Sequence, residues 1–325
     1  MGCRTCIAFL FYMDMKRDFD SMSFSEKEEI CNNAFREGSP FWHLYTDGTK
    51  MQNIFCSDKE FDECMNMLAA SACRVMHVQI LTFELMTNHI HLILSGSKDA
   101  CMELFMDYKN RIAKLFRKYG KVIDWSSFSA NILAIENLKR LRNEIAYCNR
   151  NAFVANPQFT PFSYPWGGGC EYFGHRMISN SYYDTMTVRD MRTIIHSRDV
   201  SAFDKLKFRN GVVSISSFCN IELGMSMFQN ARNYFYTISK NIEAFADIAC
   251  RIRDSVCLID EEIFSVAVKI SSDMYGVNKL SLLAPDQKIN LAKELRYKYF
   301  ASIQQLRRIL RLNADVLNEV FPSTK

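Results

Sequence analysis

Two histidines that flank a single apolar residue, His89 and His91, have the spacing in this chain that most clearly suggests metal chemistry. We predict that they lie in a strand over residues 89–94. Side chains alternate between the two faces of a strand, so both imidazoles would point the same way, about 7 Å apart at Cα. Two imidazoles so placed can bind one divalent metal ion. This spacing also arises by chance, so two histidines with a purely structural role would show the same pattern.

A tyrosine and an asparagine one helical turn apart, Tyr147 and Asn151, lie in a predicted helix over residues 136–152. The apolar stripe of this helix consists of Leu138, Leu141, Ile145, Cys148 and Ala152. Tyr147 lies roughly 130° from the centre of that stripe, so we expect it off the core-facing side. Asn151 should lie one turn further along on the same face as Tyr147. A tyrosine hydroxyl can act as a nucleophile, and an amide oxygen can bind a hard cation. A surface or interface tyrosine would show the same pattern.

A predicted helix over residues 99–119 carries many basic side chains. Its apolar stripe is expected to pack into the core and consists of Leu104, Tyr108, Ile112, Leu115, Phe116 and Tyr119. The basic residues lie near a single acid, Asp107, and are Lys109, Arg111, Lys114, Arg117, Lys118 and Lys121. Such a helix can follow the phosphates of a nucleic acid. A solvated basic face would have the same composition.

The order of the elements that must position these residues indicates an α+β domain with helices covering an antiparallel sheet. The predicted strands cover 41–46, 53–55, 78–86 and 89–94, with turns at Asp47-Gly48 and Thr87-Asn88. The predicted helices cover 25–35, 58–72, 99–119 and 136–152. The segment 157–174, rich in Pro, Gly and aromatic residues, is predicted to be an ordered closing loop. We expect His43 to be structural, with DNA contact as the alternative, and leave the role of Glu84 open.

Together these motifs resemble the HUH single-tyrosine transposases, and within them the REP-associated tyrosine transposases. The family's histidine strand is matched by Thr87-Asn88-His89-Ile90-His91. Its tyrosine helix is matched by residues 147–152 at the Tyr and Asn positions, but not at those of Ile and Pro. The first strand and the closing loop of the family resemble residues 41–46 and 162–167. The resemblance covers roughly residues 38–180, and its specificity comes from the order and spacing of the motifs.

The resemblance implies a ferredoxin-like (RRM-like) sheet with the histidine strand in its middle. It also implies that His89, His91 and Asn151 bind Mg²⁺ or Mn²⁺. Tyr147 would then attack a DNA phosphorus, forming a 5′-phosphotyrosine and leaving a free 3′-OH. The implied partner is single-stranded DNA that forms hairpins, and enzymes of this family act as monomers or as homodimers. The expected function is metal-dependent nicking and strand transfer.

Beyond residue 180 the pattern becomes mainly helical. We therefore expect an N-terminal extension (1–37), the catalytic domain (38–180) and a helical domain (181–325). Helical patterns over residues 284–320 suggest a helix-turn-helix, with Ala301-Ser302-Ile303 as a turn and cap. The candidate DNA-contacting side chains there are Gln304, Gln305, Arg307, Arg308 and Arg311. A small helical bundle with a solvated basic face is the alternative.

Composition sets wider limits. The 325 residues are 48% hydrophobic, enough for a sizeable core and more readily for two domains than one. The net charge of +4 means that any DNA contact must come from local patches. The twelve cysteines form no regular framework, which suggests reduced thiols, and Cys3 and Cys6 lack the second ligand pair of a zinc site. No apolar run is long enough to span a membrane, so we expect a cytoplasmic protein without a membrane partner.

Other functions stay open at this point. A replication initiator or relaxase of the HUH class would share the chemistry, although many carry a second tyrosine or a third histidine near the motif. A domesticated, non-catalytic DNA-binding protein could keep the same fold and residues. A hydrolase unrelated to DNA is disfavoured by the two basic helical regions.

Overall fold

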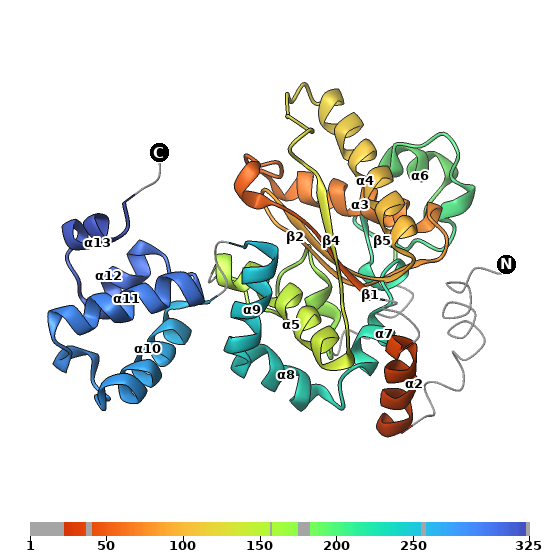
Figure 1. Ribbon diagram of the computed structural model, residues 1–325. Helices are drawn as coiled ribbons and strands as arrows, with labels where there is room; N and C mark the ends of the chain where they lie inside the picture. Colours follow the sequence, from red (N-terminus) through yellow and green to blue (C-terminus); the bar gives the residue numbers. More distant parts are fainter. Residues whose placement is uncertain (1–22, 37–40, 157, 175–182, 255–257, 323–325) are drawn as a thin grey trace. The chain divides into compact units, whose positions relative to one another are not determined.

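The computed structural model describes residues 23–36, 41–156, 158–174, 183–254 and 258–322, which are coloured in Figure 1. The chain divides into two compact units, which we call the sheet unit (Met1–Ile238) and the helical unit (Ser239–Lys325). The division follows Ile238, whereas the sequence analysis placed a boundary at 180/181. Cys3, Cys6 and most of the expected N-terminal extension lie outside the described residues.

The sheet unit contains a four-stranded antiparallel sheet in the order β2-β3-β1-β4. The strands are β1 (Phe41–Thr46), β2 (Val78–Leu85), β3 (Ile90–Gly96) and β4 (Ala130–Ala134). β3 lies inside the sheet, and its alternate residues Ile90, Leu92 and Leu94 are fully buried. The expected α+β class with an antiparallel sheet is therefore confirmed. β4, a short strand at the edge of the sheet, was not predicted.

Helices cover both faces of this sheet. α3 (Asp58–Arg74) and α4 (Lys98–Lys118) pack together over one face, and α5 (Leu138–Ala155) lies over the other (Figure 1). Each helix begins at a polar cap that accepts a backbone N–H from the first turn, which satisfies a donor that the helix itself leaves open. The caps are Ser57, Ser97 and Asn137.

Two local predictions were wrong. Residues 53–55 form no strand, because the backbone N–H groups of Ile54 and Phe55 both donate to the carbonyl of Thr87. Tyr119 is 38% exposed rather than part of the core, and its hydroxyl donates to Glu63. The helix ends at Lys118, so the stripe that predicted Tyr119 as buried does not continue to it.

Two segments that follow α5 hydrogen-bond to the edge strand β2. In the closing loop, the carbonyl of Trp166 accepts the N–H of Leu85, and further along the chain the N–H of Asn220 donates to Ile80. In its described residues, 158–174, the loop is ordered, as predicted. The remaining helices and strands of the unit are α2 (Phe24–Arg36), α6 (Val188–Ile195), β5 (Phe208–Arg209), β6 (Val212–Val213), α7 (Ile221–Ser226) and α8 (Ala231–Lys240), which runs past the division. Its short 3-10 turns are η1 (Gly48–Lys50), η2 (Gly168–Glu171), η4 (Ser201–Phe203) and η5 (Ile215–Ser217).

The helical unit consists of helices and one 3-10 turn in its described residues. They are α9 (Ile242–Ile252), α10 (Asp260–Tyr275), η6 (Leu280–Leu282), α11 (Pro285–Tyr299), α12 (Ile303–Leu310) and α13 (Ala314–Val320). The predicted cap is confirmed, because Ser302 and Gln305 form a reciprocal capping box at the start of α12. Across the described parts of both units, no helix is long and apolar enough to cross a membrane.

Candidate active site

The face of the sheet beneath α5 carries a row of polar side chains. In the strand register, His91 of β3 pairs with Glu84 of β2 on one side and with Tyr45 of β1 on the other. His43 precedes Tyr45 by two residues and therefore points to the same face. These side chains are all buried; His43 and His91, for example, are 0% and 1% exposed. The sheet thus gathers residues from three strands under one helix.

A buried relay runs from α5 through β1 to His91. The Oε2 atom of Glu144 lies 2.8 Å from Nδ1 of His43, and Nε2 of His43 lies 3.0 Å from Nδ1 of His91. A carboxylate accepts, so Nδ1 of His43 is the donor, and with one proton on His43 its Nε2 accepts from His91. His91 then carries its proton on Nδ1 and presents the lone pair of Nε2. This is the tautomer that binds a metal ion through Nε2.

The environment of His91 also keeps its ring neutral. Burial, followed by the neighbouring rings of His89 and His43, holds the pKa of His91 well below its usual range. The rings of His91 and His43 are 5.2 Å apart between centroids, and those of His91 and His89 are 5.0 Å apart. A neutral imidazole is the form that can act as a ligand, so His91 is prepared for metal binding.

A second hydrogen-bond chain fixes His89, which immediately precedes β3. The Nδ2 of Asn88 donates to the carbonyl of Gly48 over 2.8 Å, which orients the amide so that its Oδ1 faces Nδ1 of His89 at 2.7 Å. Nδ1 of His89 must therefore carry the proton, and Nε2 is its ligand atom. Ligand nitrogens of His89 and His91 lie within 4.8 Å of each other. The two histidines could thus hold one metal ion.

Tyr147 lies beside His91 and His43, but not as expected. Its ring is 6.1 Å from that of His91 and 6.4 Å from that of His43, edge-on to the former. We expected Tyr147 off the core-facing side of its helix, yet the residue is only 2% exposed. The reason is that every residue of α5 from Glu144 to Ala152 is buried, including the polar residues Asn149 to Asn151. The apolar stripe seen in the sequence marks only one of the buried faces of α5.

Asn151, the expected third ligand, is 5% exposed and lies one turn after Tyr147. Its backbone N–H donates to Glu84 over 3.2 Å, and that of Ala152 donates to the same carboxylate over 3.0 Å. Glu84 is the register partner of His91, so Asn151 lies next to the row of polar side chains. Burial raises the pKa of Glu84 well above its usual range, and the two backbone donors only partly oppose this.

α4, which carries the predicted basic residues, packs over one face of the sheet, and α5, which carries Tyr147, packs over the other (Figure 1). Lys114, Arg117 and Lys118 are exposed, whereas Lys109 and Arg111 are partly buried. Arg111 donates through Nε to Asp107 over 2.6 Å. The structure therefore does not place these residues beside the tyrosine and the histidines.

The candidate DNA-contacting residues of the helical unit differ in whether their side chains are exposed or bonded to other residues of the protein. Gln304, Arg307 and Arg311 are exposed. Gln305 is buried and donates to the carbonyl of Leu258 over 3.0 Å, so its role is structural. Arg308 makes a two-pronged ion pair with Asp260, at 2.7 and 3.0 Å.

The sequence analysis missed Glu144 and did not connect His43 to His91. A carboxylate three residues before the tyrosine was the available signal for Glu144, since it lies one turn away on the same helix. No local signal joins His43 to His91, because they lie 48 positions apart in the chain.

Comparisons with protein-family models, with curated proteins and with solved structures find no match for this chain.

Proposed function

We propose that the sheet unit is a metal-dependent nuclease that nicks single-stranded DNA through Tyr147 and transfers the cut strand, in the manner of the HUH single-tyrosine transposases. The observation that carries the proposal is the placement of the Tyr147 ring 6.1 Å from that of His91. His91 and His89 both present Nε2 as the ligand atom. The proposed nucleophile, the two proposed ligands and the chain from Glu144 through His43 thus lie together between α5 and the sheet.

The order of the strands supports the same assignment. The succession β1-α3-β2-β3-α4-β4 with the sheet order β2-β3-β1-β4 is the connectivity of a ferredoxin-like fold. The histidine strand β3 is an inner strand, as the resemblance implies. We therefore propose a ferredoxin-like sheet for this unit.

We propose His89 and His91 as ligands of Mg²⁺ or Mn²⁺, with the amide oxygen of Asn151 as the third. A bound divalent cation would polarise a DNA phosphate and stabilise the charge that develops on it. Imidazoles are weak ligands for Mg²⁺, so oxygens of the DNA phosphate should strengthen binding. The relay from Glu144 through His43 acts on His91 by fixing its tautomer, which makes both of them positioning residues.

Tyr147 would carry the covalent step. Its hydroxyl loses a proton, its oxygen bonds to the phosphorus, and the bond from phosphorus to the 3′ oxygen breaks; the departing oxygen takes up a proton. The product is a 5′-phosphotyrosine and a free 3′-OH, which can later attack the phosphotyrosine linkage of another end. Because Tyr147 is buried in the structure, the segments that cover it must rearrange before a phosphate can reach it.

We propose a hairpin-forming single strand as the DNA partner, with the basic residues of α4 and of α12 as phosphate contacts. The chain should be incubated with single-stranded hairpins from its own genomic flanks and Mn²⁺, and the products separated on a denaturing gel. Cleavage that is lost with EDTA and in Tyr147→Phe, but kept in the matched loop variant Tyr164→Phe, would support the proposal. Tight binding without cleavage across a range of flanks would instead favour a non-catalytic DNA-binding protein.

A further inference from the structure

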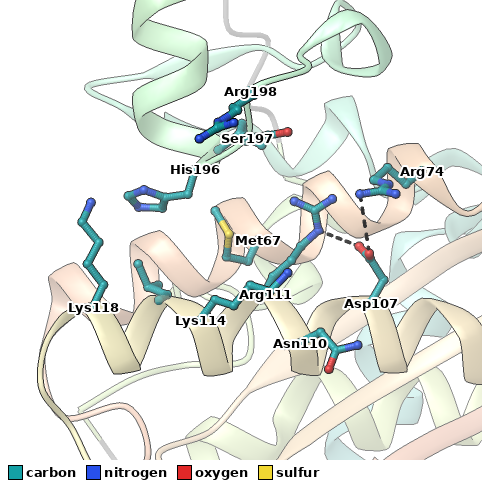
Figure 2. Close-up of a pocket in the computed structure, with 12 residues that line it drawn as sticks. Met67, Arg74, Asp107, Asn110, Arg111, Lys114, Lys118, His196, Ser197 and Arg198 are labelled. Carbon is teal, nitrogen blue, oxygen red and sulfur yellow. Dashed lines mark hydrogen bonds and ion pairs between the residues drawn. The ribbon is translucent and has the colours of Figure 1, made fainter.

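A basic cavity lies in the sheet unit away from the tyrosine and the histidines. It has a volume of about 370 Å³ and lies between α3, α4 and the residues that follow α6 (Figure 2). Since α5 covers the opposite face of the sheet, this cavity and the candidate active site are separate. Its charged lining consists of Arg74, Arg111, Lys114, Lys118 and Arg198, with Asp107 as the single acid.

The charges of the cavity are poorly balanced by the protein itself. Asp107 accepts from Arg111 over 2.6 Å and from Ser71 over 2.9 Å, and Arg74 lies 4.0 Å from it. Lys114, Lys118 and Arg198 make no ion pair with any residue of the described parts of the chain. Like charges held together in a partly enclosed space repel one another and favour an anion between them.

Arg111 gives a second, independent indication. Its side chain is only 11% exposed, its Nε is fixed by Asp107, and its guanidinium carbon lies 5.9 Å from the ring centroid of Phe203. Its Nη2 is buried and has no hydrogen-bond partner among the described residues. A buried guanidinium N–H without an acceptor is costly, so an acceptor supplied by a ligand would remove that cost.

The remaining lining fits the rest of such a ligand. Met67, Leu115 and Ile195 are apolar, while Asn110 and Ser197 are polar. The ring of His196 also lines the cavity, and burial together with nearby Lys118 lowers its pKa. The volume exceeds that of a bare phosphate and falls in the range of small-molecule sites, about 300–1,000 Å³.

We propose that this cavity binds the phosphate group of a phosphate ester, with Arg111, Lys114 and Lys118 as its main contacts. Fork-shaped guanidinium groups and flexible lysines are the side chains that proteins use for phosphate. The ester group would occupy the apolar side of the cavity. The ligand is either a free nucleotide or the phosphorylated end of a nucleic-acid strand, which share this chemistry.

The test is calorimetric titration of the full chain at low salt with deoxyadenosine 5′-monophosphate, with deoxyadenosine as the phosphate-free control. We expect the nucleotide to bind and the nucleoside not to bind. Lys118→Ala should weaken binding about tenfold, because it removes one charged contact to phosphate. Lys59→Ala is the matched control, since Lys59 is an exposed lysine of α3 that lies outside the lining and is not a proposed DNA contact; the affinity of this variant should change less than about twofold.

Competition then distinguishes the two sources of phosphate. Displacement of the nucleotide by a 5′-phosphorylated oligonucleotide, but not by the same strand with a 5′-hydroxyl, would identify a strand end as the ligand; no displacement by either would identify the free nucleotide. The proposal is overturned if neither the nucleotide nor the phosphorylated strand binds, or if Lys59→Ala weakens binding as much as Lys118→Ala. Because the readout is binding and not cleavage, its outcome does not depend on the role of Tyr147.

Discussion

The relay that ends at His91 assigns different tasks to residues of the same chemical type. His91 and His89 present Nε2 as ligand atoms, whereas His43 bridges Glu144 to His91 and is not proposed as a ligand. Partners behind a metal ligand commonly set its orientation and basicity. We therefore expect metal binding to depend on Glu144 as well as on the histidines.

Glu144→Gln should weaken Mn²⁺ binding roughly 10- to 100-fold, because it removes the charge that fixes the proton on Nδ1 of His43. The measurement is titration with Mn²⁺ followed by calorimetry, with Glu136→Gln as the control, since Glu136 is exposed just before the same helix. Equal affinities in the two variants would contradict a role for the relay.

The lowered pKa of His91 predicts a pH effect on stability in the absence of metal. The folded chain holds the pKa of this ring below the ordinary histidine value of about 6.5, so the unfolded chain binds the proton more readily. The free energy of unfolding should therefore fall as pH drops from about 6.5, by at most about 1.4 kcal/mol per pH unit from this ring.

Glu84 acts in the opposite sense, because its raised pKa makes the folded chain bind a proton more readily as pH falls. The informative comparison is thus chemical denaturation of the unsubstituted chain and His91→Gln at pH 7.5 and 5.5. The loss of stability on acidification should be smaller in His91→Gln. A variant that loses as much as the unsubstituted chain would show that His91 does not carry the effect.

At the scale of elements, local patterns sufficed for the helices that cover the sheet and for its inner strands. Alternation along residues 90–94 predicted the buried strand, and apolar residues at helical spacing predicted α3, α4 and α5. The burial of Tyr147 was not accessible, because Asn149, Arg150 and Asn151 are residue types typical of a surface and give no sign that α5 is covered around them. The pairing of His43 with His91 depends on strand register over a long separation, which a single sequence does not determine.

The packing of α7 against the rest of the sheet unit can be tested at Gly224. A Cβ at Gly224 would lie 2.7 Å from Cζ of Tyr172, whose hydroxyl donates to the carbonyl of Leu81 over 2.9 Å. Gly224→Ala should therefore lower the free energy of unfolding by about 1–3 kcal/mol through overpacking. Denaturant titration measures it, and the exposed Glu222→Ala on the same helix should leave stability nearly unchanged. If both variants match the unsubstituted chain, α7 is not packed as described.

At the scale of the whole molecule, the chain combines a sheet unit with candidate chemistry and a helical unit with exposed basic residues. The sequence predicted the three C-terminal helices but not the ion pair that commits Arg308 to Asp260. The guanidinium of Arg308 is therefore paired within the fold, whereas Arg307 and Arg311 face solvent.

We expect Arg307→Ala and Arg311→Ala to weaken binding of a single-stranded hairpin, and each to reduce the salt dependence by about one phosphate contact. Arg308→Ala should have a smaller effect on binding, because its guanidinium is already paired. Affinity measured by fluorescence anisotropy over a series of salt concentrations distinguishes these cases. Identical binding by all three variants and the unsubstituted chain would remove the helical unit from the DNA contacts.

The most direct test of the central proposal is to find the atom to which DNA becomes attached. After reaction of the chain with a cleavable hairpin and Mn²⁺, nuclease trimming and proteolysis leave a nucleotide on the peptide that carried the covalent bond, and tandem mass spectrometry locates it. The account predicts a 5′-linked deoxynucleotide on Tyr147. Cleaved DNA with the nucleotide on another residue, or with no covalent product at all, would contradict it.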